Sequence, residues 1–258
     1  MNLDPYLLAE DSIENSFPEI WYDIIEENHF WFYWRLKAFL SILKKLKINL
    51  NSPHYSFDVG SGNALLVSQL ESISDWSIDG CNISPKFVGK LKLKGKYFQY
   101  DVLTKRADLK EKYDSVILFD ILEHLNYPQA FLEAASYHVK PGGHIFINVP
   151  AFQTLYSRYD IAGGHKMRYS KKTVSQLVNP ELFSIKDIRY WGMMLSPLIL
   201  FRKILSANST DNQKILTQGM RTPSGFINTP LRLLAEIETT LISKPPLGCS
   251  VMLTLQKK

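Results

Sequence analysis

The stretch Phe57-Asp58-Val59-Gly60-Ser61-Gly62 decides the fold class of this 258-residue chain. A short hydrophobic run, Tyr55–Val59, ends here in a turn with two glycines, and the apolar run Ala64–Leu70 that follows is typical of a helix. Glycines let the backbone approach a ligand closely, and the first helical turn offers free N–H groups and a positive dipole end. The stretch therefore predicts a nucleotide-type binding loop between a strand and a helix. The dinucleotide fingerprint Gly-x-Gly-x-x-Gly does not fit, because position 65 is Leu.

Strands and helices are expected to alternate beyond this loop. Further strands are predicted at Trp76–Cys81, Tyr97–Tyr100, Tyr113–Phe119, His144–Val149, Phe183–Tyr190 and Cys249–Gln256. Helices are predicted from Ser84-Pro85 onward, over Tyr127–Val139 up to Pro141-Gly142-Gly143, and over Lys171–Val178, whereas Ala151–Tyr169 is predicted to be a loop over the sheet. This alternation favours an α/β fold: a Rossmann-like, mostly parallel seven-stranded sheet with helices on both faces and an antiparallel last strand.

The pattern divides the chain into four parts. Apolar residues at helical spacing over residues 17–48 predict a helical N-terminal segment, residues 1–50, that covers the binding loop. Residues 51–190 form the core, broken helical stretches over 191–245 form a cap or lid insertion, and 246–258 form the closing strand.

Composition argues against a disordered, disulfide-rich, secreted or membrane-spanning protein. The hydrophobic share of 45% supports a sizeable core, and the net charge of +5 permits an acidic substrate or a membrane surface without requiring nucleic acid. Cys81 and Cys249 match neither a metal-ligand spacing nor a disulfide framework. We find no signal peptide pattern at the N-terminus and no transmembrane run, so we expect a cytoplasmic protein.

Five segments together resemble the class I S-adenosylmethionine-dependent methyltransferases. The segment Phe57–Gly62 resembles that family's first motif, hydrophobic-Asp-x-Gly-x-Gly-x-Gly, with Ala64 in place of the third glycine. Four more segments follow in the order the family requires: Gly80–Pro85, Tyr100–Val102, Tyr113–His124 and Leu132–Pro150. The resemblance covers about residues 55–150, with a weaker likeness at the closing strand.

The resemblance implies a cofactor and the residues that bind it. The cofactor is S-adenosylmethionine, with S-adenosylhomocysteine as product. The implied binding residues are Arg35, Asp58, Gly60, Ser61, Gly62, Asn82, Ile83, Asp101, Val102 and Phe119. Arg35 is placed at the cofactor's carboxylate, by similarity to ubiquinone-biosynthesis O-methyltransferases, and Asp101 at the adenine amino group. Asn82 stands where the family has an acid for the ribose hydroxyls, and an amide lacks that charge.

Two histidines are candidates for a general base. Methyl transfer is an in-line displacement, and a hydroxyl acceptor must lose a proton. His124 and His165 could take it, with Glu123 orienting one of them, although each histidine could equally stabilise its own loop. The segment Asp160–Ser170 resembles the D-x-x-x-G-H-x-R-R-Y run of methyltransferases of sugar, lipid and secondary-metabolite pathways. Some related O-methyltransferases bind a divalent metal at Glu-x-x-Glu-His, here Asp120-Ile121-Leu122-Glu123-His124, but we expect no metal.

The prediction is therefore a methyltransferase for a small-molecule acceptor of sugar, lipid-linked or secondary-metabolite type, acting by O-methylation. The alternative is a catalytically impaired protein of the same fold that serves as a binding or assembly partner. A nucleic-acid methylase is disfavoured, because residues 119–122 lack the Asn/Asp-Pro-Pro-Tyr motif. The apolar stretch 191–205, with Arg202 and Lys203 near its end, predicts a packed lid helix, and a homodimer interface or a peripheral membrane contact remain open.

Overall fold

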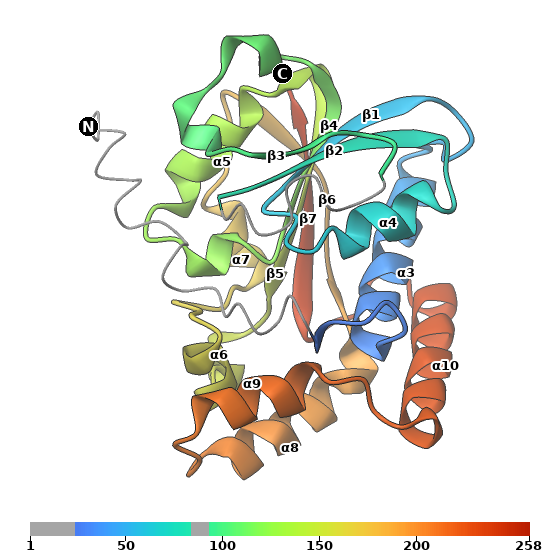
Figure 1. Cartoon of the computed structure of the whole chain (residues 1–258), viewed down its shortest axis with the longest axis vertical. Coiled ribbons are helices and arrows are strands. Elements are labelled where there is room, and N and C mark those ends of the chain that lie inside the picture. Colours follow the sequence, from blue (N-terminus) through green and yellow to red (C-terminus); the bar gives the residue numbers. More distant parts are fainter. Residues whose placement is uncertain (1–23, 84–92) are drawn as a thin grey trace.

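A single seven-stranded sheet, seen in a computed structural model that describes residues 24–83 and 93–258, organises the molecule (Figure 1). The strand order is β3-β2-β1-β4-β5-β7-β6. The strands are β1 His54–Val59, β2 Trp76–Asn82, β3 Tyr97–Gln99, β4 Tyr113–Phe119, β5 Val139–Pro150, β6 Phe183–Trp191 and β7 Ser250–Lys257. Strands β1 to β5 run parallel, whereas β7 is antiparallel to both of its neighbours, β5 and β6.

Helices bury both faces of the sheet. One face packs against α5 (Pro128–Ser136) and α7 (Lys171–Ser175), and the other packs against α3 (Phe30–Lys45) and α4 (Leu65–Glu71). The central strands are accordingly almost wholly apolar. In β4 only Asp114 is not fully buried, which is the pattern of a parallel strand covered on two sides.

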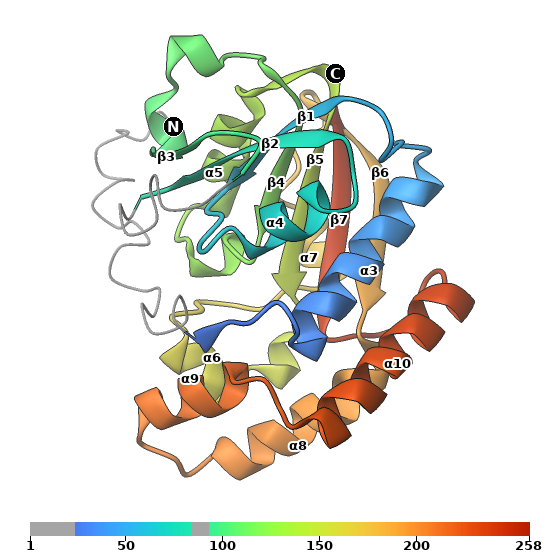
Figure 2. The ribbon, with the colours of Figure 1, turned by 45° about the vertical axis from the view of Figure 1, so that its right-hand side comes forward.

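A group of helices lies beyond the carboxyl ends of the parallel strands (Figure 2). It contains α6 (Arg158–Ala162), α8 (Ser196–Ser206), α9 (Asn212–Met220) and α10 (Gly225–Leu241). Helix α10 packs along α3, where Arg232 lies 4.1 Å from the Tyr33 ring and Lys37 pairs with Glu236 at 2.8 Å. Ligands of open α/β sheets bind at this edge, so these helices face the expected site.

Most predicted elements are confirmed, and three predictions needed correction. The helix predicted over 17–48 is interrupted: Ile24 is helical, residues 25–29 are not, and α3 begins at Phe30, where the His29 ring accepts the Trp31 N–H at 3.0 Å and caps the helix. The loop predicted at Ala151–Tyr169 contains α6 and a 3-10 turn, Gln153–Leu155. A capping box of Ser157 and Asp160 starts α6.

The third correction concerns Pro141-Gly142-Gly143, predicted to end a helix. These residues lie inside β5, which begins at Val139 opposite Tyr113 and is irregular in register there. Gly142 has φ +78°, and its backbone absorbs that irregularity. The helix predicted from Ser84-Pro85 falls on residues 84–92, outside the described residues. None of the described helices is long and apolar enough to cross a membrane.

Candidate active site

The loop after β1 has a backbone that glycine favours. Gly60, Gly62 and Ala64 have φ values of +68°, +57° and +57°, so every second residue is left-handed. A Cβ atom on Gly60 would lie 2.7 Å from Ile121 Cδ1, so a side chain there would have to displace Ile121. Neighbouring strands hold the loop: the Ser61 N–H donates to the Cys81 carbonyl at 3.0 Å, and the Tyr97 hydroxyl donates to the Gly62 carbonyl at 2.5 Å.

Two adjoining cavities open at this loop. The larger has a volume of about 500 Å³ and the smaller about 40 Å³, and they share Gly60, Gly62, Asp120 and His124 as lining residues. All ten residues implied in cofactor binding line one or both cavities. The larger is lined by Arg35, Asp58, Gly60, Ser61, Gly62 and Phe119, and the smaller by Gly60, Gly62, Asn82, Ile83, Asp101 and Val102. The structure therefore brings together residues that are far apart in the sequence.

The carboxylate of Asp120 is the centre of a polar network in the larger cavity. Arg35 Nη1 donates to Asp120 Oδ2 at 2.6 Å, and Asn148 Nδ2 donates to Asp120 Oδ1 at 2.6 Å. The Trp191 indole fixes Asn148 in turn, donating to Asn148 Oδ1 at 2.8 Å. Arg35 is buried, and its Nε has no hydrogen-bond partner among the described residues. Such a donor at a cavity wall fits a ligand that bears a carboxylate.

Asp58 stands in the same buried region, at the end of β1. Its side chain is 3% exposed, and burial raises the pKa of the Asp58 carboxyl to about 7, which the charge of Arg35 partly counteracts. On the other side of the loop, Asn82 Oδ1 accepts the Ile83 N–H at 2.9 Å and Asp101 Oδ1 accepts the Leu103 N–H at 2.9 Å. These two bonds hold the side chains at the ends of β2 and β3, beside the smaller cavity.

The two candidate histidines meet in the wall of the larger cavity. Their rings are 4.8 Å apart and nearly perpendicular. His124 Nδ1 lies 3.2 Å from the Gly164 carbonyl oxygen, which can only accept, so Nδ1 carries the proton. Burial and the charge of His165 lower the pKa of His124 to about 3. His124 is therefore a neutral and very weak base at physiological pH.

His165 has a different partner, the carboxylate of Asp160. His165 Nδ1 lies 2.8 Å from Asp160 Oδ1, and Arg168 Nε donates to the same oxygen at 2.8 Å. Ser157 donates to Asp160 Oδ2 through its N–H at 2.8 Å and its hydroxyl at 3.0 Å. Burial raises the pKa of Asp160, but the hydrogen bond from His165 and the positive charge of Arg168 outweigh burial and hold this pKa well below its usual range. An ionised Asp160 can only accept, so His165 Nδ1 carries a proton and Nε2 is the ring nitrogen left to take up another.

Glu123 is not the residue that holds His165. Asp160, rather than Glu123, holds the ring of His165. The Glu123 carboxyl is 1% exposed, its Oε2 has no hydrogen-bond partner among the described residues, and burial beside Asp120 raises its pKa. Ligand atoms of Glu123, His124 and His165 lie within 4.8 Å of one another. Asp120, the other acid of the metal alternative, is held by Arg35 and Asn148 instead.

Asp160, Arg168, Asp120 and Asn148 were absent from the predicted site. One signal could have located the first of them, because Ser157-x-x-Asp160 is a capping-box pattern that predicts a fixed, buried acid. The pairing of Asp120 with Asn148 joins β4 to β5 across 28 positions, and no local pattern carries it.

Comparisons with known proteins agree with this geometry. Residues 57–145 match a family described as a methyltransferase domain. A ubiquinone biosynthesis O-methyltransferase from Dechloromonas aromatica (strain RCB) is 30% identical over 98 residues, which are 35% of this chain and 42% of that protein. The chain thus spans about two fifths of the length of this curated relative.

Solved structures share the fold at low identity. A [4+2]-cyclase, SpnF, has a TM-score of 0.54 at 13% identity, over 85% of this chain and 80% of that one. The N-methyltransferase NodS from Bradyrhizobium japonicum WM9, solved with S-adenosyl-L-homocysteine, has a TM-score of 0.50 at 10% identity, over 86% of each chain. A coclaurine N-methyltransferase has a TM-score of 0.52 at 11% identity, over 85% and 71%. The matched methyltransferase domain, the glycine loop and the strand order together support a class I S-adenosylmethionine-dependent methyltransferase.

Proposed function

We propose that this protein transfers a methyl group from S-adenosylmethionine to a hydroxyl of a small-molecule acceptor. One observation carries the proposal: two cavities meet at Gly60, Gly62, Asp120 and His124, so one cleft has room for a donor and an acceptor side by side. The likeness to an O-methyltransferase over 98 residues supports an oxygen acceptor. The SpnF likeness shows that this fold also hosts other chemistry, so the argument rests on the site.

The residues present fit the cofactor. When bound, S-adenosylmethionine supplies a methyl group activated by a positively charged sulfur. In our proposal Asn82 and Asp101 hold the adenosine end in the smaller cavity, and the backbone of the glycine loop lies against the middle of the molecule. Arg35, with its buried and unpartnered Nε, binds the carboxylate end. Asp120 places negative charge near a ligand that carries two positive charges.

We assign the base to His165 rather than His124. Asp160 holds the protonated Nδ1 of His165, so the proton of the acceptor goes to Nε2, and the carboxylate stabilises the imidazolium that forms. His124, with its pKa lowered to about 3, cannot take a proton readily and instead packs edge-on against the His165 ring. The site must also align the acceptor hydroxyl with the methyl group, and in our proposal the apolar wall of the larger cavity positions the acceptor.

Substitution of His165 tests the base assignment. We expect His165→Asn to lower kcat for methyl transfer by about 10²–10⁴-fold, because a positioned base contributes that much. The affinity for S-adenosylmethionine, measured by calorimetry, should stay within about twofold. Asp160→Asn should lower kcat less and shift the pH–rate profile, because the ring loses a charged partner. An unchanged kcat in His165→Asn would remove the base from the proposal.

Two other outcomes would change the function itself. If S-adenosylmethionine and S-adenosylhomocysteine fail to bind in calorimetry, the chain is a binding or assembly partner that keeps the methyltransferase fold. If exhaustive chelation abolishes turnover and added divalent metal restores it, Glu123, His124 and His165 are ligands instead of the metal-free set proposed here. We also propose a reducing, cytoplasmic setting, since Cys81 and Cys249 are buried and unpaired.

A further inference from the structure

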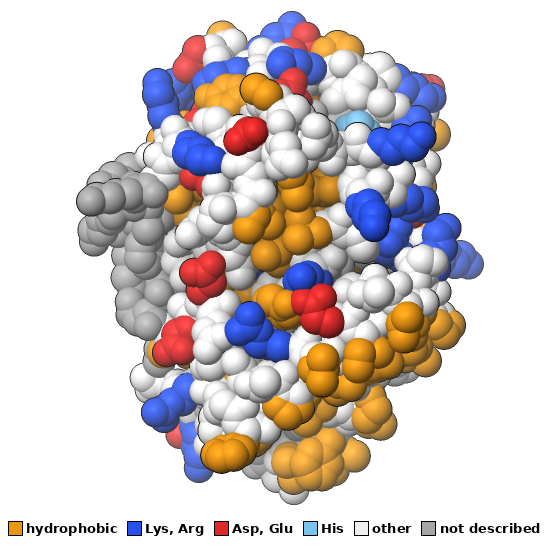
Figure 3. Space-filling view, turned by 90° about the vertical axis from the view of Figure 1, so that its right-hand side faces the viewer, with side chains coloured by type: hydrophobic (Ala, Val, Ile, Leu, Met, Phe, Trp, Pro, Cys, Tyr) orange, Lys and Arg blue, Asp and Glu red, His pale blue; other side chains and the backbone are white. Residues whose placement is uncertain are grey.

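Exposed hydrophobic side chains are concentrated on two helices of the cap. Five are on α8 and five on α10, ten of the 17 large hydrophobic side chains that are exposed in the described part of the chain. They are Leu198, Leu200, Phe201, Ile204 and Leu205 on α8, and Phe226, Ile227, Leu233, Ile237 and Leu241 on α10. Figure 3 shows hydrophobic side chains gathered at the lower end of the molecule, where α10 runs. We call these ten residues the apolar face.

The outward side of α10 carries no charge. Phe226, Leu233, Ile237 and Leu241 follow one another at intervals of seven, four and four residues, so they form one stripe along the helix. The charged residues of α10 point elsewhere: Arg232 and Glu236 contact α3, and the Glu238 carboxylate accepts the Gly192 N–H at 2.6 Å. The charged side chains of α10 are thus held by neighbouring elements while its large apolar groups face outward, which is unusual in a surface that meets only water.

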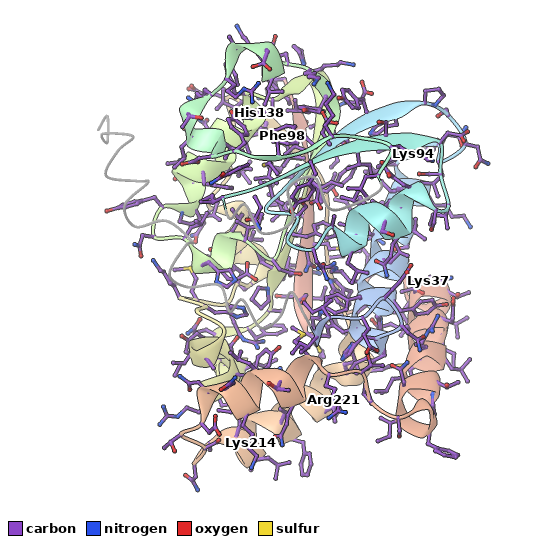
Figure 4. All side chains as sticks on the ribbon, in the orientation of Figure 1. Lys37, Lys94, Phe98, His138, Lys214 and Arg221 are labelled. Atoms are coloured by element: carbon purple, nitrogen blue, oxygen red, sulfur yellow. The ribbon has the colours of Figure 1, made fainter. Side chains whose placement is uncertain are left out.

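The two charged groups of α8 are likewise turned away from its exposed side. The Arg202 guanidinium lies 4.0 Å from the centre of the Tyr159 ring, and Lys203 Nζ donates to the Thr154 carbonyl at 2.6 Å. The exposed part of α8 is therefore hydrophobic, with Ile204 64% and Leu205 67% exposed. Basic side chains lie beside this hydrophobic part of α8. They are Lys214 and Arg221, which are exposed at the two ends of α9 (Figure 4).

The apolar face continues into the larger cavity. Leu198, Phe201 and Leu205 of α8 and Ile227 of α10 are exposed and also line that cavity. An acceptor must pass this mouth, and a protein partner seated on it would block the passage. An uncharged face with an open mouth and basic residues at its margin matches the chemistry of an anionic lipid surface.

We infer that the apolar face docks on an anionic lipid bilayer and that the acceptor is a lipophilic molecule that enters the cavity directly from it. The docking is argued from the apolar face alone, whereas the lipophilic acceptor rests on the proposed function. In the docked state the side chains of α8 and α10 lie among the acyl chains while Lys214 and Arg221 meet headgroup phosphates. The apolar chain of the acceptor then occupies the space between α8 and α10, and its polar head reaches His165.

Vesicle co-sedimentation of the full chain tests the docking. The test variant is Ile204→Glu, Phe226→Glu, Leu233→Glu, three positions that do not line the cavity. The matched control is Ile73→Glu, which changes a 44% exposed side chain before β2, at the opposite end of the parallel strands. Vesicles of phosphatidylglycerol and phosphatidylcholine are compared with vesicles of phosphatidylcholine alone.

We expect the wild type and Ile73→Glu to bind anionic vesicles and to release them as salt rises. The triple variant should bind at least about tenfold more weakly, and Lys214→Ala about fivefold more weakly. Affinity for S-adenosylmethionine should be unchanged in all four proteins. The inference is overturned if the wild type stays in the supernatant, or if the wild type is a dimer by sedimentation velocity that the triple variant converts to a monomer.

The acceptor half has a separate readout. Bound to vesicles, the protein should accelerate methylation of a hydroxylated aromatic that carries a long alkyl chain over its short-chain analogue, and the triple variant should lose that preference. Methylation of neither compound, with vesicle binding intact, would count against the proposed function and leave the docking in place. Equal rates for both compounds would overturn the acceptor class alone.

Discussion

Asp58 is a deeply buried acid at the start of the glycine loop. Burial raises the pKa of its carboxyl to about 7, so the folded protein holds a proton there that the unfolded chain has already released above about pH 4. The contribution of Asp58 to stability is therefore fully present below that pH and is lost as the pH rises through about 7.

Asp58→Asn keeps the shape of the side chain and removes this titration. We expect the variant to gain stability relative to the wild type as the pH rises from 5 to 8, by on the order of 2–4 kcal/mol. The free energy of unfolding in urea, measured without cofactor at both pH values, checks the prediction. An equal difference at the two pH values would contradict a protonated Asp58.

Asn82 is the other residue whose charge bears on the cofactor. Its amide oxygen already accepts the Ile83 N–H, and it stands beside the smaller cavity where the family carries an acid. Hydrogen bonds to an ionised acceptor are roughly twice as strong as neutral ones. Asn82→Asp should therefore bind S-adenosylmethionine about three- to tenfold more tightly in calorimetry, and Asn82→Ala more weakly. If both variants match the wild type, Asn82 does not contact the ribose.

Among the elements, the loop between β1 and α4 depends most on glycine. Gly60→Ala would place a Cβ atom 2.7 Å from Ile121 Cδ1 at a φ of +68°. We expect the variant to lose about 1–2 kcal/mol of stability from the backbone conformation. Its Kd for S-adenosylmethionine should rise at least about tenfold, because the strained loop and the displaced Ile121 side chain both line the smaller cavity.

Gly142 offers a matched control for that prediction. It has a φ of +78°, in β5, and a Cβ atom there would meet nothing within 4 Å. Gly142→Ala should lose a similar amount of stability while its Kd for the cofactor stays unchanged. If both variants weaken binding equally, the loss reflects general destabilisation rather than the loop.

The loop could be predicted because its chemistry is local. Asp58, Gly60 and Gly62 lie within five positions of one another, so a pattern in the sequence reports their geometry. The same holds for β4, where an unbroken apolar run predicts a strand buried on two faces. Asp120, Asn148 and Trp191 depend on three different strand ends, and only the sheet order brings them together.

The cap was predicted only in outline for a related reason. Helices α8 and α10 have apolar residues on the side that packs and on the side that is exposed, so their hydrophobic pattern shows no single face. The stretch 191–205 could be singled out as apolar, yet the stripe on α10 and its continuity with the cavity depend on how the two helices are placed.

At the scale of the whole molecule, the site joins parts that are otherwise separate. The larger cavity is lined by α3, the loop after β1, the end of β4, α8 and α10. A ligand bound there contacts the core and the cap together, and it should stabilise both. At 100 times its Kd, S-adenosylmethionine should add about 2.7 kcal/mol to the free energy of unfolding.

For a domain of this size that gain corresponds to a rise in Tm of about 5–10 °C. Differential scanning calorimetry at several cofactor concentrations checks the value, and Gly60→Ala should show a smaller rise at the same concentration. A second transition that the cofactor leaves in place would show that the cap unfolds independently of the core.

The position of β7 has a consequence for how the protein is made. This strand, Ser250–Lys257, is the last in the chain, yet it lies between β5 and β6 and supplies all the strand pairing of β6. While a ribosome is still translating the cap, β5 has an open edge and β6 has no neighbour. An open edge rich in Ile and Val is a template for pairing with another chain. Until β7 has been synthesised, the nascent protein is therefore at risk of aggregating through these unpaired strand edges.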